Sequence, residues 1–106
     1  MTADPGMMTE PTRTVDAAGT QAWYVNGQRH RLDGPAFIYA DGHQEWYVNG
    51  QRHRLDGPAL IYANGTQEWW VNHQNITTQV EAWMQTQAVT WPWDDQTQML
   101  FQLTWG

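Results

Sequence analysis

The sequence predicts a mainly β fold with a C-terminal α segment, in which antiparallel β-hairpin repeats are capped by one or two short helices. Segment 23–45 recurs almost unchanged as 46–68, so the period is 23 residues, which is typical of stacked units that bury apolar surface against their neighbours. Each copy contains Asn-Gly or Asp-Gly pairs, which favour tight turns between antiparallel strands. After residue 74 this pattern stops, and apolar side chains recur at helical spacing.

The chain divides into three regions. Residues 1–12 contain Pro and Gly without periodicity, which indicates a flexible N-terminal tail. Residues 13–74 form the repeat region, and residues 75–106 form a helical cap. Within the repeat region, residues 14–21 align with the second half of a repeat, so we expect a degenerate unit that caps the N-terminal end of the stack.

Each full repeat is predicted to be a β-hairpin followed by a shorter return strand. Asp41-Gly42 predicts a type I′ turn with positive φ at both residues, joining strands over 36–40 and 43–48, and Asn64-Gly65 repeats it. Asn26-Gly27 and Asn49-Gly50 give the same signal before the Gln-Arg-His-Arg segment. The Leu-Asp-Gly-Pro segment that follows indicates a loop, because Pro cannot donate to a strand ladder.

Aromatic residues fall on both faces of the predicted strands. Alternate residues of a strand point to opposite sides, so Trp46 and Val48 share one face while Tyr47 lies on the other. Each face therefore needs cover from a neighbouring repeat, from a terminal element or from a partner.

The C-terminal residues predict helices. The third unit starts at Trp69 and loses the pattern at His73, where the first two units have Gly. A helix over about 77–88 follows from apolar residues at helical spacing and from Thr78 and Glu81, which form a capping-box pattern. Trp91-Pro92-Trp93 then breaks the helix. Asp94 or Asp95 can cap a last short helix whose apolar stripe is Met99, Leu100 and Leu103, although a strand over 100–105 stays open.

Composition limits the classes of function. The formal net charge is −6, and all five bases are Arg, so general binding to nucleic acid or to anionic membranes is not expected. No Cys is present, which excludes disulfides and thiolate metal sites. No apolar run is long enough to cross a membrane, and the N-terminus lacks the pattern of a signal peptide, so we expect a cytoplasmic protein.

Catalysis is not predicted. The chain has no Ser and no Cys, and its Thr residues lie in variable surroundings, so no nucleophilic constellation can be assembled. His30 and His53 occupy the same repeat position, with Asp33 and Asp56 as the nearby carboxylates, but Asp is expected in turns in any case. A structural role for both histidines is the favoured interpretation. We expect no enzyme activity, no metal site and no cofactor.

The repeat resembles the MORN repeat family through Trp46-x-x-Asn49-Gly50-x-Arg52-His53 and Tyr62-x-Asn64-Gly65, over roughly residues 14–72. The chain departs from the family pattern after the histidine, where Arg54 and Asp56-Gly57-Pro58 replace the usual glycine spacing. It is more similar to the WYxNGxxHRxDGPA proteins of tailed bacteriophages and large viruses, which end in a segment like residues 91–94. These resemblances imply a MORN-like meander, a viral origin, a host-cell cytoplasmic location and protein–protein contact.

Four of the five bases lie at two repeat positions and are expected to stack into one ridge on an acidic protein. With the neighbouring aromatic residues they form the candidate binding site: Arg29, Arg31, Arg52, Arg54, Tyr24 and Tyr47. The alternative is structural: Arg31 and Arg54 pair with Asp33 and Asp56 or with Glu45 and Glu68, or stack on Trp and Tyr rings.

The favoured function is that of a small non-enzymatic protein-binding module, phage-encoded, which occupies or inhibits a host factor or defence complex. The motivation is the small size, the absence of a catalytic constellation and the aromatic residues on both strand faces. A structural virion or assembly component, which predicts self-association, is the alternative. Carbohydrate binding between the Trp/Tyr pairs of adjacent repeats is the third hypothesis.

Overall fold

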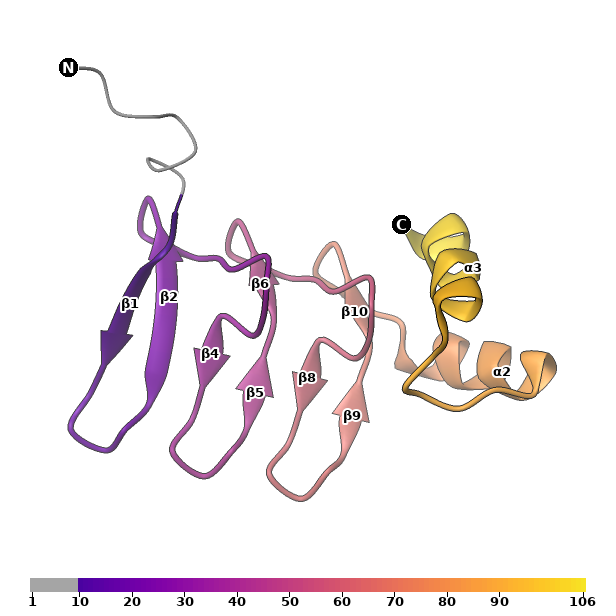
Figure 1. Cartoon of the computed structure of the whole chain (residues 1–106), viewed down its shortest axis with the longest axis horizontal. Coiled ribbons are helices and arrows are strands. Elements are labelled where there is room, and N and C mark those ends of the chain that lie inside the picture. Colours follow the sequence, from indigo (N-terminus) through magenta and orange to yellow (C-terminus); the bar gives the residue numbers. More distant parts are fainter. Residues whose placement is uncertain (1–9) are drawn as a thin grey trace, which may run out of the picture.

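The computed structural model describes residues 10–106 and contains a row of antiparallel β-hairpins followed by two helices (Figure 1). The mainly β fold with a helical C-terminal end is therefore confirmed. The strands are β1 (Thr12–Val15), β2 (Gln21–Val25), β3 (Gln28–Arg29), β4 (Phe37–Ile38), β5 (Gln44–Glu45), β6 (Tyr47–Val48), β7 (Gln51–Arg52), β8 (Leu60–Ile61), β9 (Gln67–Glu68), β10 (Trp70–Val71) and β11 (Gln74–Asn75). The helices are α2 (Thr77–Gln87) and α3 (Asp95–Trp105).

The hairpins lie side by side in one sheet, in the order β1-β2-β4-β5-β8-β9. Its neighbours all pair antiparallel, so the sheet grows by one hairpin per repeat. β3 pairs with β2, and the equivalent segments of the next two units form separate small sheets, β6 with β7 and β10 with β11. The predicted strand over 43–48 is interrupted at Trp46, whose N–H donates to the carbonyl of Ala59 in the next hairpin.

The two kinds of turn differ. Asn26-Gly27 and Asn49-Gly50 have positive φ at both residues, as predicted. At Asp41-Gly42 the prediction is wrong: only the Gly has positive φ (97°), the Tyr39 N–H donates to the His43 carbonyl, and the loop between them contains three residues. A three-residue loop that ends in a left-handed Gly is the other common hairpin connection.

Neighbouring units are joined by backbone hydrogen bonds that repeat along the chain. The Arg31 N–H donates to the carbonyl of Tyr47 (3.1 Å), and one repeat later the Arg54 N–H donates to the carbonyl of Trp70 (3.1 Å). The third unit keeps this pattern although His73 replaces Gly, because Asn72 and His73 both adopt positive φ. The repeat therefore continues to Asn75, further than the sequence pattern indicated.

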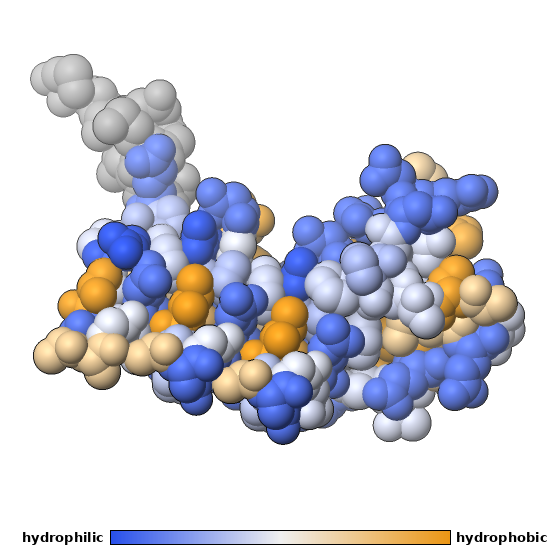
Figure 2. All heavy atoms as spheres, turned by 60° about the horizontal axis from the view of Figure 1, so that its bottom comes forward, coloured by the Kyte–Doolittle hydropathy of each residue, from blue (hydrophilic) through white to orange (hydrophobic). Residues whose placement is uncertain are grey.

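The sheet has two faces with different side chains. Cross-strand partners share a face, and alternate residues face opposite sides. We call the face that carries Trp23, Trp46 and Trp69 the Trp face, and the face that carries Tyr24, Tyr47 and Trp70 the Tyr face. Figure 2 shows hydrophobic spots spaced along successive hairpins and separated by polar side chains, so the surface in that view carries no continuous apolar patch.

The helices begin differently from one another. α2 spans nearly the predicted range, but the predicted capping box is wrong: Ile76 is the N-cap residue and makes no side-chain capping bond. Instead, the Thr77 hydroxyl accepts a hydrogen bond from the Trp69 N–H (3.0 Å). In the first two units the equivalent N–H groups, of Trp23 and Trp46, donate to the carbonyls of Ala36 and Ala59 respectively. α3 is capped by Asp94, which accepts from the Thr97 N–H, so a strand over 100–105 is excluded.

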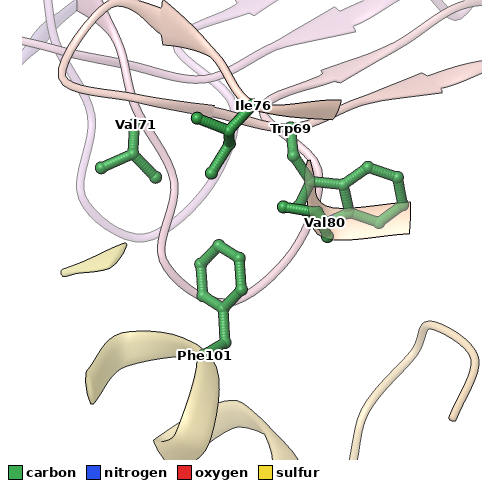
Figure 3. Close-up of a cluster of buried hydrophobic side chains, with 5 residues drawn as sticks. All are labelled: Trp69, Val71, Ile76, Val80 and Phe101. Atoms are coloured by element: carbon green, nitrogen blue, oxygen red, sulfur yellow. The ribbon is translucent and has the colours of Figure 1, made fainter. Parts of the chain in front are cut away.

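The buried apolar cluster lies where the helices meet the third unit. Figure 3 shows Phe101 of α3 pointing toward Ile76 and Val71, with Trp69 and Val80 beside them. The predicted stripe of Met99, Leu100 and Leu103 is exposed, so it does not pack on the sheet. The packing face is instead formed by Thr97, Phe101 and the partly buried Trp105.

The N-terminal end of the sheet is the β1–β2 hairpin, which is the degenerate unit expected over residues 14–21. β1 begins at Thr12, and all four of its residues are exposed. Residues 1–9 of the predicted tail lie outside the described part of the chain.

Candidate binding surface

Two of the candidate arginines, Arg29 and Arg52, stack on the Tyr face. The Arg29 guanidinium lies 4.2 Å from the ring centre of Phe37 and 5.4 Å from that of Tyr47. The Arg52 guanidinium lies 4.9 Å from Trp70 and 5.8 Å from Tyr47. Both are half-buried, and Tyr47 is buried between them. These side chains therefore cover the Tyr face from within the chain.

The other two arginines lie on the Trp face. Arg31 stacks on Trp23 at 4.0 Å from the ring centre, its Nε pairs with the Asp33 carboxylate (2.9 Å), and its Nη1 donates to the Pro35 carbonyl (3.2 Å). Arg54 makes the same three contacts one repeat later with Trp46, Asp56 and Pro58. The expectation of a single ridge is therefore wrong, because the four arginines divide between opposite faces. The pairing and ring stacking proposed as the structural alternative are present.

A buried carboxylate organises the Tyr face. Glu45 is 5% exposed and accepts hydrogen bonds from the Tyr47 hydroxyl (2.6 Å) and from His43 Nε2 (2.8 Å), with Arg52 at 3.8 Å. Burial raises the pKa of Glu45, but the two hydrogen bonds and the Arg52 charge outweigh it and hold the pKa below its usual value. Glu68 repeats the arrangement by accepting from Tyr62 and Trp70.

The two candidate histidines join neighbouring units. Nδ1 of His30 accepts the N–H of Asn49 (2.9 Å), and Nδ1 of His53 accepts the N–H of Asn72 (3.0 Å). Each Asn has positive φ, so the bond anchors a tight turn of the next unit. Burial lowers the pKa of His53, which favours the neutral ring that can accept this bond. Both rings therefore have the structural role that the sequence favoured.

A hollow of about 500 Å³ opens on the Trp face of the second unit. Its lining includes Trp46 and Val48 together with the Arg-Leu-Asp loops of the first and second units. α3 borders it through Gln98 and Gln102. We call this site the Trp46 hollow. It combines apolar side chains with Trp and Arg, two residue types that are enriched in protein interfaces.

The equivalent place on the third unit is filled by the C-terminal segment. Phe101 belongs to the buried cluster of Trp69 and Val71, which correspond to Trp46 and Val48, and the Trp93 ring stacks on Trp69 with 6.3 Å between ring centres. The indole N–H of Trp91 donates to the Asp56 carbonyl (3.3 Å), and the Arg54 guanidinium lies 5.6 Å from the ring centre of Trp91. A Cβ at Gly57 would come within 2.8 Å of Trp91 Nε1, so the ring uses the space that Gly leaves.

Identical residues therefore differ in exposure between the two places. Leu32 is 79% exposed, while its copy Leu55 is half-buried and packs against the C-terminal cluster. Pro58 is fully buried, while its copy Pro35 is only partly covered. Because the local sequence is the same, the difference comes from the surroundings, where Leu55 meets the cluster that the third unit and the C-terminal segment form.

Sequence reasoning missed the roles of Trp91 and Phe101. The sequence pattern places Trp91 in a helix break and leaves Phe101 outside the predicted stripe. A signal was available for Phe101, because Thr97, Phe101 and Trp105 recur every four residues and lie on one side of a helix. No local pattern indicates that Trp91 contacts a loop 35 positions earlier.

Comparison with known proteins gives no match: no family model, no curated protein and no solved structure is similar to this chain. Between residues 10 and 106, no three His, Asp or Glu side chains come together in a group that could hold a metal ion. Neither helix in this part of the chain is long and apolar enough to cross a membrane.

Proposed function

We propose that this protein is a non-enzymatic protein-binding module whose contact surface is the uncovered part of the Trp face, centred on the Trp46 hollow. The observation that carries the proposal is the pair of equivalent places. On the third unit, the C-terminal segment buries the Trp-Val surface, whereas on the second unit the same surface borders an open hollow.

The residue types of the hollow support protein contact. Trp and Arg are enriched among residues that contribute most to binding energy. Trp46 and Arg54 are held by stacking and hydrogen bonds before any partner arrives, so little side-chain entropy remains to be lost on binding. Leu32 adds an exposed apolar side chain at the rim.

The candidate residues of the Tyr face are a less favourable contact surface. Tyr47 is buried, and Arg29 and Arg52 are stacked on aromatic rings, so a partner would have to displace internal contacts to reach them. Tyr24 and Arg29 at the N-terminal end of this face are half-buried and can contribute at its edge. Arg31 and Arg54 border the hollow and remain candidate binding residues there.

The resemblance to phage repeat proteins makes a host factor or defence complex in the cytoplasm the first class of partner to test. The experiment is a capture from host lysate by the intact protein and by two matched variants, Leu32→Glu and Leu103→Glu. Both leucines are almost equally exposed (79% and 78%), but only Leu32 lines the hollow. We expect a partner, identified by mass spectrometry, that Leu103→Glu retains and Leu32→Glu loses. Equal capture by both variants would contradict the proposed surface.

A further inference from the structure

We infer that the Trp46 hollow is a receptor for a tryptophan-bearing peptide segment of the partner, in which an indole ring sits on the Arg31–Gly34 loop beside an apolar side chain on Trp46 and Val48. This inference rests on the proposed function and adds the chemistry of the partner. The template is the chain's own C-terminal segment, which makes these contacts one repeat later.

The template has two parts. The first is an indole: Trp91 lies against Arg54, donates its N–H to the Asp56 carbonyl and occupies the space above Gly57. The second is aromatic cover of the groove: the Trp93 ring stacks on Trp69 with 6.3 Å between ring centres, and the fully buried Phe101 belongs to the same cluster as Trp69 and Val71. Together the two parts cover the loop at Arg54–Gly57 and the adjacent strand surface at Trp69 and Val71.

The uncovered loop of the first unit has the groups that correspond to those which Trp91 contacts in the second unit. Arg31 is held flat on Trp23 by the same contacts that hold Arg54 on Trp46, so a cationic surface is already in place for an indole. The Asp33 carbonyl corresponds to the acceptor at Asp56. A Cβ at Gly34 would approach Arg31 at 3.0 Å, and the three atoms nearest to that position all belong to Arg31, whereas at Gly57 two of the three nearest atoms belong to the Trp91 ring.

Two observations favour an external partner over a second copy. The C-terminal segment already packs against the third unit of its own chain, and the hollow lies at the equivalent position one unit earlier. The segment of a second copy would therefore have to leave its own chain to fill the hollow. The net charge of −6 makes two copies repel one another, whereas a partner with basic residues would be attracted to the rim. The Asp33 carboxylate on this rim is 86% exposed.

The test uses the full chain and a synthetic peptide with the sequence of residues 89–106, labelled with fluorescein for anisotropy titration. The matched control peptide carries Trp91→Ala. We expect the first peptide to bind, with affinity at least tenfold lower for the control peptide and for the protein variant Leu32→Glu, and unchanged for Leu103→Glu. In ¹⁵N spectra the peptide should shift the amides of Leu32 and Gly34.

Three outcomes would overturn the inference. The first is equal affinity for both peptides, or no binding up to about 1 mM peptide. The second is a shift of Leu55 and Gly57 in place of Leu32 and Gly34, which shows that the peptide has displaced the chain's own segment. The third is a dimer in sedimentation velocity that Leu32→Glu dissociates, which assigns the hollow to a second copy. If lysate capture still depends on Leu32 while the peptide fails, the proposed function stands and only the partner's chemistry is wrong.

Discussion

The first and second units of this protein place one loop sequence in two environments. Residues 32–36 and 55–59 are identical, and both form the same loop with the same Arg–Asp pair and the same stack on Trp. Around 55–59 the C-terminal segment completes an apolar cluster, while around 32–36 the loop borders an open hollow. The local sequence therefore determines the backbone, and the presence of a covering segment determines whether the surface is buried or open.

Removal of the covering ring should have the largest effect. Phe101→Ala removes a fully buried ring from the cluster on the third unit, and we expect the free energy of unfolding to fall by about 3–5 kcal/mol. Leu100→Ala is the control on the neighbouring, exposed side of α3, where the loss should stay below about 0.5 kcal/mol. Urea unfolding followed by circular dichroism measures both. Similar losses would show that α3 does not anchor the cap.

Substitution of the three equivalent tryptophans by Ala should cost more stability where the ring is more deeply buried. Trp69→Ala removes a ring that is 3% exposed, with an expected cost of about 3–5 kcal/mol. Trp46 and Trp23 are half-buried, so their Ala variants should cost less, with Trp46 the more costly because a full unit lies on either side. Melting temperatures of the three variants test the order. An equal loss at all three positions would show that the repeats share one core, contrary to the comparison between units.

The arginines of the Tyr face should contribute to stability by stacking. Arg29→Ala with Arg52→Ala removes four cation–π contacts and the 3.8 Å approach to Glu45. At about 0.5–1 kcal/mol for each stack, we expect the melting temperature to fall by several degrees. Affinity for the partner, corrected for the folded fraction, should stay within twofold. A tenfold loss of affinity with an unchanged melting temperature would instead place the binding site on the Tyr face.

The smallest expected effect is the pH dependence of folding stability that arises from Glu45, between the first and second units. The pKa of Glu45 is lowered by folding, so its contribution to stability is complete above the ordinary Glu pKa of about 4.3 and is lost as the pH falls through the folded value. Glu45→Gln should therefore flatten the fall in melting temperature between about pH 5 and pH 3. Asp33→Asn is the exposed control, with a weaker effect because solvent screens its pair with Arg31. An unchanged slope in Glu45→Gln would show that the Glu45 network does not stabilise the fold.

The sequence was sufficient to predict what depends on local spacing. The 23-residue period, the alternation of Trp and Tyr across the sheet, and the helix near residues 77–88 follow from periodicity and turn residues, whereas the sequence leaves a strand open over residues 100–105, where the structure has α3. The Asp41-Gly42 turn was misjudged because the same dipeptide serves both two-residue and three-residue loops. The length of the loop depends on the register of the two strands, which the dipeptide alone does not determine.

The candidate site was less predictable because it depends on contacts distant in sequence. Arg29 and Arg31 are two residues apart, but the chain leaves the strand after Arg29, so the two side chains stack on opposite faces. The hollow exists because the last helix covers one copy of the surface and leaves the other copy open. That asymmetry arises from tertiary packing of Trp91 and Phe101, which the repeat pattern does not contain.

Hydroxyl-radical footprinting of Leu32 and Leu55 tests the central claim most directly, because the two side chains lie in the same sequence context and have the same intrinsic reactivity. In the free protein, the 79% exposed Leu32 should oxidise several times faster than the half-buried Leu55. With the partner bound, the Leu32 rate should fall toward that of Leu55. Equal rates in the free protein, or a Leu32 rate that the partner leaves unchanged, would contradict the proposal that the open copy of the surface is the binding site.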